Sequence, residues 1–191
     1  PLLKMARLNQ SDVRIIQHSS IARFTLPRRL QAHLFDPLKS THHARHGWIN
    51  RVIQPWLRYG QTKLANCAFA SWLHHEFRSH NLGIQSILTH PGVTQTQLYP
   101  NRANFGLSSS QRMRMVQWVS MTDTVGSTAL IRAICDPSLK SGDFIGFGRG
   151  LMPFSQHPIV FPFERFYDNP KTRQLLWQKS CQAIGQSFFV E

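Results

Sequence analysis

Acidic residues are scarce in this sequence of 191 residues. Nine Asp and Glu stand against 22 Lys and Arg, which gives a formal net charge of +13. Such an excess is typical of chains that bind nucleic acids or anionic membranes. The basic residues are scattered, however, and the densest groups are only RR at 28–29 and RMR at 112–114. With no RNA- or DNA-binding motif beside them, we do not expect a nucleic-acid partner; a solvated basic surface, or a half-protein whose other half is acidic, explains the charge.

Cysteine and long apolar runs are scarce as well. Cys67, Cys135 and Cys181 are widely spaced and form no CxxC pair. This pattern excludes a disulfide framework and a zinc site of the usual kinds, and it predicts free thiols in a reducing intracellular compartment. No apolar run approaches the roughly 18–20 residues that cross a membrane. Membrane association by other means and a homo-oligomer both stay open.

The N-terminal stretch PLLKMARLNQ lacks an initiator Met, and it also lacks the hydrophobic core and cleavage site of a signal peptide. We therefore expect a chain that is either processed or incomplete. Missing residues could carry a targeting segment, so the sequence does not indicate a particular cellular compartment.

Strand-like and helix-like patterns alternate along the chain. The sequence predicts helices at 1–10, from about 56 to 80, within 94–120, at 122–134 and at roughly 170–184, and strands at 11–20, 84–92 and 141–148. Alternating strands and helices favour an α/β fold with a parallel sheet. Hydrophobic residues make up 41% of the chain, enough for the core of one domain, 1–191.

Residues 21–53 show no clear period and are interpreted as an insertion loop. Three histidines, His42, His43 and His46, lie close together there. No ordered fourth ligand accompanies them, so we favour a solvated loop over a metal site. Residues 151–191 are interpreted as an aromatic, Pro-rich loop on the substrate side followed by the last helix.

The stretch RYGQTKLAN, residues 58–66, places Tyr59 and Lys63 four positions apart in a helical pattern. Residues i and i+4 share one helix face, so the ammonium would lie beside the phenol. A fixed positive charge favours the phenolate, which makes a tyrosine usable as a general acid or base at a carbonyl or alcohol. Ser20, at the end of the strand RIIQHSS, is placed to hold the substrate oxygen. The spacing alone is equally typical of a surface pair without function.

Three segments in this order carry more information than the pair alone. SDVRIIQHSS, RYGQTKLANCAFASWLHHEF and GIQSILTHPGVTQTQLYP resemble the catalytic half of the short-chain dehydrogenase/reductase family. Within that family they are most similar to the branch of retinol dehydrogenases and protochlorophyllide reductases. The closing FYDNPKTRQLLWQKSCQAIG is similar to that branch's last helix, so the resemblance covers about 1–185. It implies a doubly wound, Rossmann-like parallel sheet.

The resemblance also implies roles for individual residues. Tyr59 matches the catalytic tyrosine, and Lys63 matches the lysine that assists it and binds the nicotinamide ribose. Ser20 matches the serine that orients the substrate, with Ser19 as the alternative. The remaining implied cofactor contacts are Pro91, Gly92, Val93 and Thr96. The implied cofactor is NADP, or NAD, and the implied partner is a small apolar carbonyl or alcohol.

One part of the family pattern has no counterpart here. The glycine-rich phosphate loop would precede everything in this chain, and GFGRG at 146–150 lacks the following helix that such a loop requires. Ser20 and Tyr59 are also 39 positions apart, more than is usual for the family. We therefore expect an N-terminally truncated Rossmann-like fragment that is inactive alone. A non-catalytic dehydrogenase relic that serves as an interaction protein is the alternative.

The substrate is expected to be bulky and apolar. Five aromatic residues near the C-terminus either line its pocket or pack in the core: Phe154, Phe161, Phe163, Phe166 and Tyr167.

Overall fold

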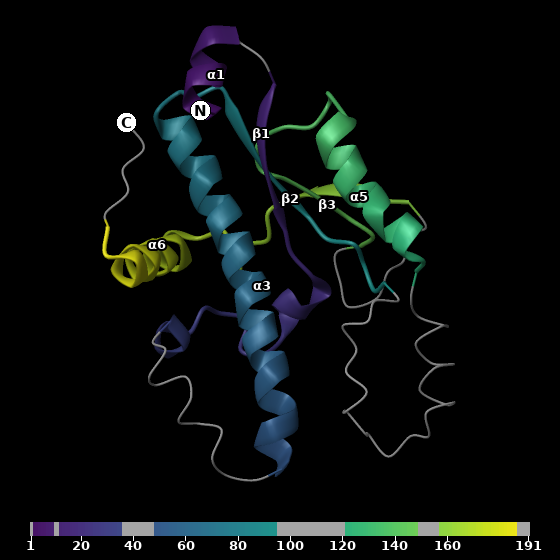
Figure 1. Cartoon of the computed structure of the whole chain (residues 1–191), viewed down its shortest axis with the longest axis vertical. Coiled ribbons are helices and arrows are strands. Elements are labelled where there is room, and N and C mark those ends of the chain that lie inside the picture. Colours follow the sequence, from purple (N-terminus) through teal and green to yellow (C-terminus); the bar gives the residue numbers. More distant parts are fainter. Residues whose placement is uncertain (1, 10–11, 36–47, 95–120, 149–156, 187–191) are drawn as a thin grey trace.

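The computed structural model describes residues 2–9, 12–35, 48–94, 121–148 and 157–186 (Figure 1). Within them the elements follow in the order α1 (Leu2–Asn9), β1 (Val13–His18), η1 (Ile21–Phe24), η2 (Ala32–Phe35), α3 (Trp48–Ser79), β2 (Ile84–Thr89), α5 (Asp123–Cys135), β3 (Asp143–Gly146), β4 (Ile159–Pro162) and α6 (Pro170–Ile184). The loop and helix expected within 94–120 lie outside the described residues, apart from Thr94. The histidines at 42, 43 and 46 lie outside them as well.

The strands form one sheet in the order β1-β2-β3-β4. β1, β2 and β3 are parallel, so the predicted α/β, Rossmann-like fold is confirmed. β1 and β2 pair in register up to His18 opposite Thr89, and their carboxyl ends therefore meet at one edge. β4 runs antiparallel to β3 and is absent from the sequence prediction. Its four residues end in Pro162, and so short a run shows no strand period.

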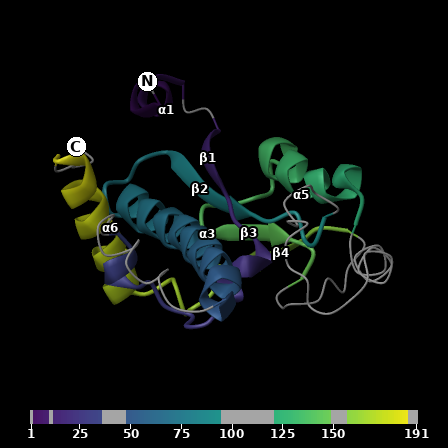
Figure 2. The ribbon, with the colours of Figure 1, turned by 60° about the horizontal axis from the view of Figure 1, so that its bottom comes forward.

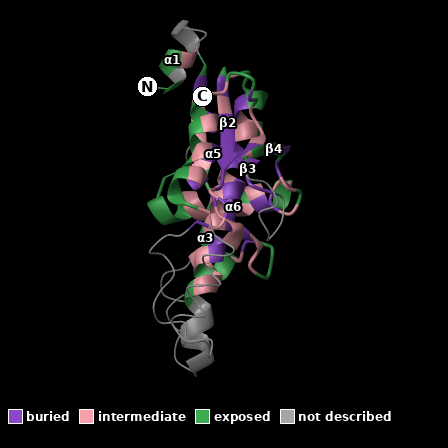
Figure 3. Ribbon diagram, turned by 90° about the vertical axis from the view of Figure 1, so that its right-hand side faces the viewer, coloured by how far each residue is buried: buried purple, intermediate pink, exposed green. Residues whose placement is uncertain are grey.

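Helices cover both faces of the sheet (Figures 1 and 2). Leu88 and Phe144 point to one face and pack with Leu64 of α3, while their neighbours Ile87 and Ile145 point to the other face and pack against α5. This alternation is the two-residue period of a strand buried on both sides. Figure 3 shows the result, with buried residues concentrated along β2 and β3 between the helices.

Helix α3 begins at Trp48, eight residues before the predicted start near Trp56. The sequence prediction placed the helix start next to Pro55, and proline is typical of a first helical turn and usually breaks a helix interior. Here Pro55 lies within the helix and is exposed. Part of the predicted insertion loop is therefore α-helical, and η1 and η2 are short 3-10 helices within the same segment.

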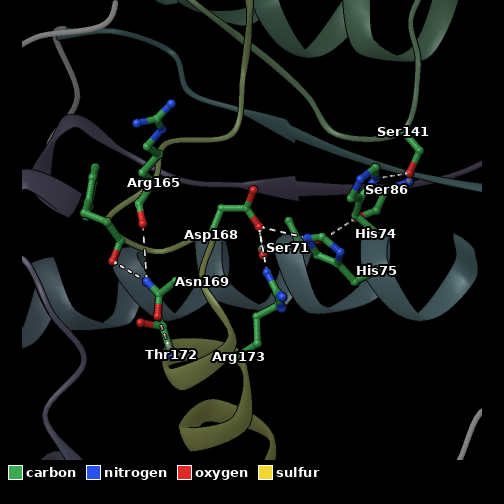
Figure 4. Close-up of polar contacts among 12 residues, drawn as sticks. Ser71, His74, His75, Ser86, Ser141, Arg165, Asp168, Asn169, Thr172 and Arg173 are labelled. Atoms are coloured by element: carbon green, nitrogen blue, oxygen red, sulfur yellow. Dashed lines mark hydrogen bonds and ion pairs between the residues drawn. The ribbon is translucent and has the colours of Figure 1, made fainter. Parts of the chain in front are cut away.

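Helix α6 has the bounds that the sequence predicts. Asn169 caps it by accepting a hydrogen bond from the Thr172 backbone N–H at 3.0 Å, and Pro170 follows in the first turn. The preceding residue, Asp168, ties α6 to α3 (Figure 4). One of its carboxylate oxygens accepts hydrogen bonds from Ser71 Oγ at 2.6 Å, His75 Nε2 at 3.1 Å and Arg173 Nη1 at 2.9 Å. The C-terminal helix is thereby fixed to the middle of α3.

Candidate active site

A pocket of about 430 Å³ opens at the carboxyl ends of β1 and β2. Ligands of open α/β sheets bind at this edge. The lining residues that the sequence had singled out are Ser19, Ser20, Tyr59, Lys63, Pro91, Gly92 and Val93. The others are His18, Ile21, Ala22, Phe24, Thr25, Trp56 and Thr94. Thr96, also expected to contact the cofactor, lies outside the described residues.

Tyr59 and Lys63 face the pocket from one side of α3. The Lys63 ammonium lies 5.7 Å from the centroid of the Tyr59 ring, a distance at which a cation interacts with an aromatic ring. The same ammonium donates to the backbone carbonyl of His18 at 3.4 Å. Asn66, one turn further along α3, donates to that carbonyl at 2.9 Å. The end of β1 is therefore held by the helix that carries the tyrosine and the lysine.

The two serines after β1 have different surroundings. Ser19 is buried, and its hydroxyl donates to the Lys63 carbonyl at 2.9 Å and lies 3.0 Å from Cys67 Sγ. Ser20 is half-buried and caps η1, with its Oγ accepting from the Ala22 N–H at 3.2 Å. That bond uses an acceptor position and leaves the hydroxyl hydrogen able to donate. Ser20 is thus better placed than Ser19 to bind a ligand oxygen.

The glycine beside Tyr59 allows η1 to approach α3 closely. A Cβ on Gly60 would lie 2.6 Å from Thr25 Cβ and 2.8 Å from the Ala22 carbonyl oxygen. Distances below 3.0 Å are not tolerated between such atoms. Gly60 therefore sets the separation between the segment after Ser20 and the helix that carries Tyr59.

The Pro91–Gly92 turn is held by His90, which the sequence analysis did not single out. His90 is 1% exposed; its Nδ1 accepts from the Gly92 N–H at 3.0 Å, and its Nε2 donates to the Gly148 carbonyl at 3.2 Å. Burial, followed by the charge of Arg23, lowers the pKa of His90 to about 3. Gly92 has φ +73°, in the left-handed region that favours glycine. The buried, neutral imidazole therefore fixes a glycine turn at the edge of the pocket.

His18 adds a titratable ring to the pocket. Its Nδ1 lies 2.8 Å from Thr89 Oγ1, across the end of the β1–β2 pair. Partial desolvation, with the Lys63 charge as a smaller cause, keeps the pKa of His18 below its usual value. Among the described lining residues none is acidic, so this side of the pocket is neutral to cationic. Such a side suits a ligand rich in hydroxyl or anionic groups.

The apolar part of the pocket lining comes from Ile21, Ala22, Phe24 and Trp56. The C-terminal aromatic residues do not supply it. Phe161, Phe163 and Tyr167 pack in the core cluster of α3 and α6, and Phe166 packs against that cluster. Phe154 lies outside the described residues. Of the two expectations for these residues, packing in the core is the one that holds for the four described ones. The aromatic pocket residues besides Tyr59 are Phe24, in the segment interpreted as an insertion loop, and Trp56, at the predicted start of the helix.

The described residues fit the nicotinamide end of a dinucleotide. Gly92 lines the pocket without a side chain, so a ligand can come close to the backbone there. The Lys63 ammonium and the Tyr59 and Ser20 hydroxyls belong to residues that line the same cavity. No group of three or more His, Cys, Asp or Glu within the described part of the chain is arranged to hold a metal ion. Nor does any helix in that part have the length and apolarity to cross a membrane.

Comparison with known proteins agrees with the fold. No family model matches the chain. A crystal structure of an uncharacterized protein from Mycobacterium paratuberculosis superposes with a TM-score of 0.60 over 94% of this chain and 53% of that one; at 20% identity, this likeness concerns the fold. The class that fold and pocket define is thus an α/β protein with a pocket at the carboxyl edge of its sheet.

Two fungal proteins narrow the class. The chain is 35% identical over 99 residues to the short chain dehydrogenase/reductase dpfgH of Gibberella zeae, and 34% identical over 106 residues to the short chain dehydrogenase/reductase dpchH of Colletotrichum higginsianum. These matches cover 48% and 51% of the chain, and 26% and 24% of the two relatives. The chain thus spans about a quarter of the length of the curated relatives it matches. Their similarity supports an oxidoreductase of the short-chain dehydrogenase/reductase type.

Proposed function

We propose that the protein is a short-chain dehydrogenase/reductase that uses NADP or NAD to reduce a carbonyl, or oxidise an alcohol, on a bulky apolar substrate. The observation that carries the proposal is that three separate segments, which carry Ser20, the pair Tyr59 and Lys63, and Gly92, line one pocket at the carboxyl edge of the sheet. The similarity to two short-chain dehydrogenase/reductases supports the same reaction class.

Each proposed catalytic residue acts on the substrate oxygen or on the tyrosine. The Ser20 hydroxyl donates its hydrogen to the substrate oxygen, while its own oxygen stays bonded to the Ala22 N–H. Tyr59 gives a proton to that oxygen in reduction and takes it back in oxidation. The Lys63 ammonium, 5.7 Å from the centroid of the Tyr59 ring, offsets the negative charge that develops on the tyrosine during the transfer. A bound nicotinamide supplies or accepts the hydride.

Lys63 and the turn of Pro91, Gly92 and Val93 are the proposed contacts of the nicotinamide ribose and ring, and Thr96 extends them. His90 is a positioning residue for this turn, because its hydrogen bonds end on Gly92 and Gly148. Residues for the adenosine end are not proposed within this chain. The preference for NADP over NAD follows from the resemblance to the retinol dehydrogenase branch alone.

The test is made on the full-length protein that contains this chain, with a panel of apolar ketones and NADPH or NADH. Tyr59→Phe is expected to abolish turnover and leave cofactor affinity nearly unchanged, because only the proton-transferring hydroxyl is lost. Lys63→Ala is expected to weaken both the rate and cofactor binding. Tyr167→Phe is the matched control, since Tyr167 is buried in the core cluster and is not among the pocket residues. Full activity in Tyr59→Phe would exclude Tyr59 as the acid and base.

A cofactor titration separates this proposal from a non-catalytic role. Micromolar binding of NADPH or NADH, with loss in Lys63→Ala and none in the exposed control Lys171→Ala, is the expected result. A full-length protein that binds neither dinucleotide would contradict the proposed function.

A further inference from the structure

The pocket changes in character along helix α3. Trp56, Tyr59 and Lys63 follow one another on the side of the helix that faces the pocket, over about 10 Å of helix axis. The Lys63 end carries the ammonium and the neighbouring His18 ring. The Trp56 end carries an indole whose plane meets the Tyr59 ring edge-on, at 80° and 6.0 Å between centroids. The proposed proton-transferring hydroxyl thus belongs to a ring between a polar end and an aromatic end.

Phe24 forms the second aromatic surface at the pocket and is held rigidly. The Arg23 guanidinium lies 4.2 Å from the centroid of its ring, and that of Arg28 lies 5.2 Å away. Phe166 packs on it at 5.6 Å. Arg23 is itself fully buried and pairs with Glu164 through two hydrogen bonds of 2.7 and 3.1 Å. Because its neighbours fix it, the Phe24 ring is set in place before a ligand arrives.

This arrangement assigns an orientation to the substrate. A nicotinamide ribose carries hydroxyl groups and belongs at the Lys63 end, where polar partners lie. The body of the substrate is then left with the apolar lining, to which Phe24 and Trp56 contribute aromatic rings. Aromatic rings in the lining favour a planar π-system over a saturated ring of equal size, because ring pairs gain affinity beyond the apolar area they bury.

We propose that Trp56, together with Phe24, selects substrates in which an aromatic or conjugated planar ring is attached directly to the reacting carbonyl carbon. This inference rests on the proposed function and adds to it the substrate class and the specificity-determining residues. It predicts that an aryl ketone binds about two- to tenfold more tightly than its saturated counterpart, the range that a ring pair provides.

The experiment uses the full-length protein and one matched pair of ketones, 2-acetylnaphthalene and 2-acetyldecalin. Dissociation constants come from shifts of backbone amide signals with saturating oxidised cofactor, a readout that every variant retains, and kcat/KM comes from NADPH consumption. Trp56→Leu keeps an apolar side chain without a ring, and Trp56→Phe keeps a ring. Trp177→Leu makes the same change on α6, where Trp177 stacks on Trp72 outside the pocket. Comparison of each variant with the wild type cancels the intrinsic reactivities of the two ketones.

The expected result is a preference for the naphthyl ketone of about two- to tenfold in the wild type. That preference should vanish in Trp56→Leu, survive in part in Trp56→Phe and stay unchanged in Trp177→Leu. Equal binding of both ketones by the wild type, binding of neither, or an unchanged preference in Trp56→Leu would each overturn the inference. Failure of the proposed function gives a different result, with no turnover of either ketone even where the binding preference is present.

Discussion

His90 makes the protein sensitive to acid in a way that can be isolated. The imidazole is buried at the Pro91–Gly92 turn, and burial, followed by the charge of Arg23, lowers its pKa to about 3. In the unfolded chain a histidine titrates near 6.5. The folded state therefore holds His90 neutral at pH values where the unfolded state protonates it.

The sign and size of the effect follow from linkage. A base whose pKa is lowered on folding contributes its full stability above the unfolded value, and this contribution is lost as the pH falls from about 6.5 toward 3. Each pH unit in this window costs about 1.4 kcal/mol. At pH 5 the folded protein has thus lost about 2 kcal/mol of its unfolding free energy through His90 alone.

The assay compares urea unfolding of the wild type and of His90→Asn at pH 7.5 and pH 5.0. Asparagine keeps a carbonyl oxygen near the Nδ1 position for the Gly92 N–H and removes the titratable ring. At pH 7.5 the variant should be less stable by about 1–3 kcal/mol, because it loses the bond to Gly148 and ring volume. Between the two pH values the wild type should lose about 2 kcal/mol more than the variant. His18 and His74 have lowered pKa values too, but they are present in both proteins and cancel.

Equal losses in the two proteins would refute the reasoning, since they would mean that His90 is not kept neutral by the fold. Cofactor affinity measured over the same pH range adds a second readout. If His90 positions Gly92, the affinity of His90→Asn should be lower than that of the wild type at pH 7.5 as well.

Two further predictions concern the packing around the pocket. Gly60→Ala is expected to destabilise the protein by about 1–2 kcal/mol despite the better helix propensity of alanine, because the new Cβ overlaps Thr25. The control is Gly83→Ala, where a Cβ meets nothing within 4 Å. Thermal unfolding of the two variants checks the prediction, and equal stability would contradict it. Glu164→Gln should cost about 3–5 kcal/mol in urea unfolding, because it leaves the fully buried charge of Arg23 without its partner. The control is Asp136→Asn, which breaks the more exposed pair with Arg132. If Glu164→Gln lowered the unfolding free energy by no more than this control does, the unpaired buried charge of Arg23 would not be the cause of the loss.

Strong local signals made most of the fold predictable. The α6 bounds follow from Asn169 as cap and Pro170 in the first turn, and α5 follows from its cap Thr122. The antiparallel β4 gave no such signal, because four residues are too few to show a strand period. The start of α3 was missed because Pro55 resembles a helix beginning.

The residues of the candidate site also fall into those that local motifs revealed and those that only the fold brings together. Tyr59, Lys63 and the Pro91–Gly92 turn were found from motifs, and the structure brings them to one pocket. Phe24 and Trp56 were not found, since they lie in or beside a segment without periodicity and act only through the fold. His90 was quoted within a motif and given no role. Its role depends on two backbone partners, one of them 58 residues away, which no local pattern reveals.

The contact between Gly60 and Thr25 divides the site into a part that tolerates redesign and a part that does not. Backbone and small side chains meet there with no space left, so the distance between the Ser20 segment and Tyr59 cannot be adjusted in small steps by substitution. Phe24 and Trp56, by contrast, belong to the pocket lining and are not part of this close backbone contact. A laboratory library aimed at new substrates should therefore vary those two positions together and keep Gly60 and Thr25 unchanged.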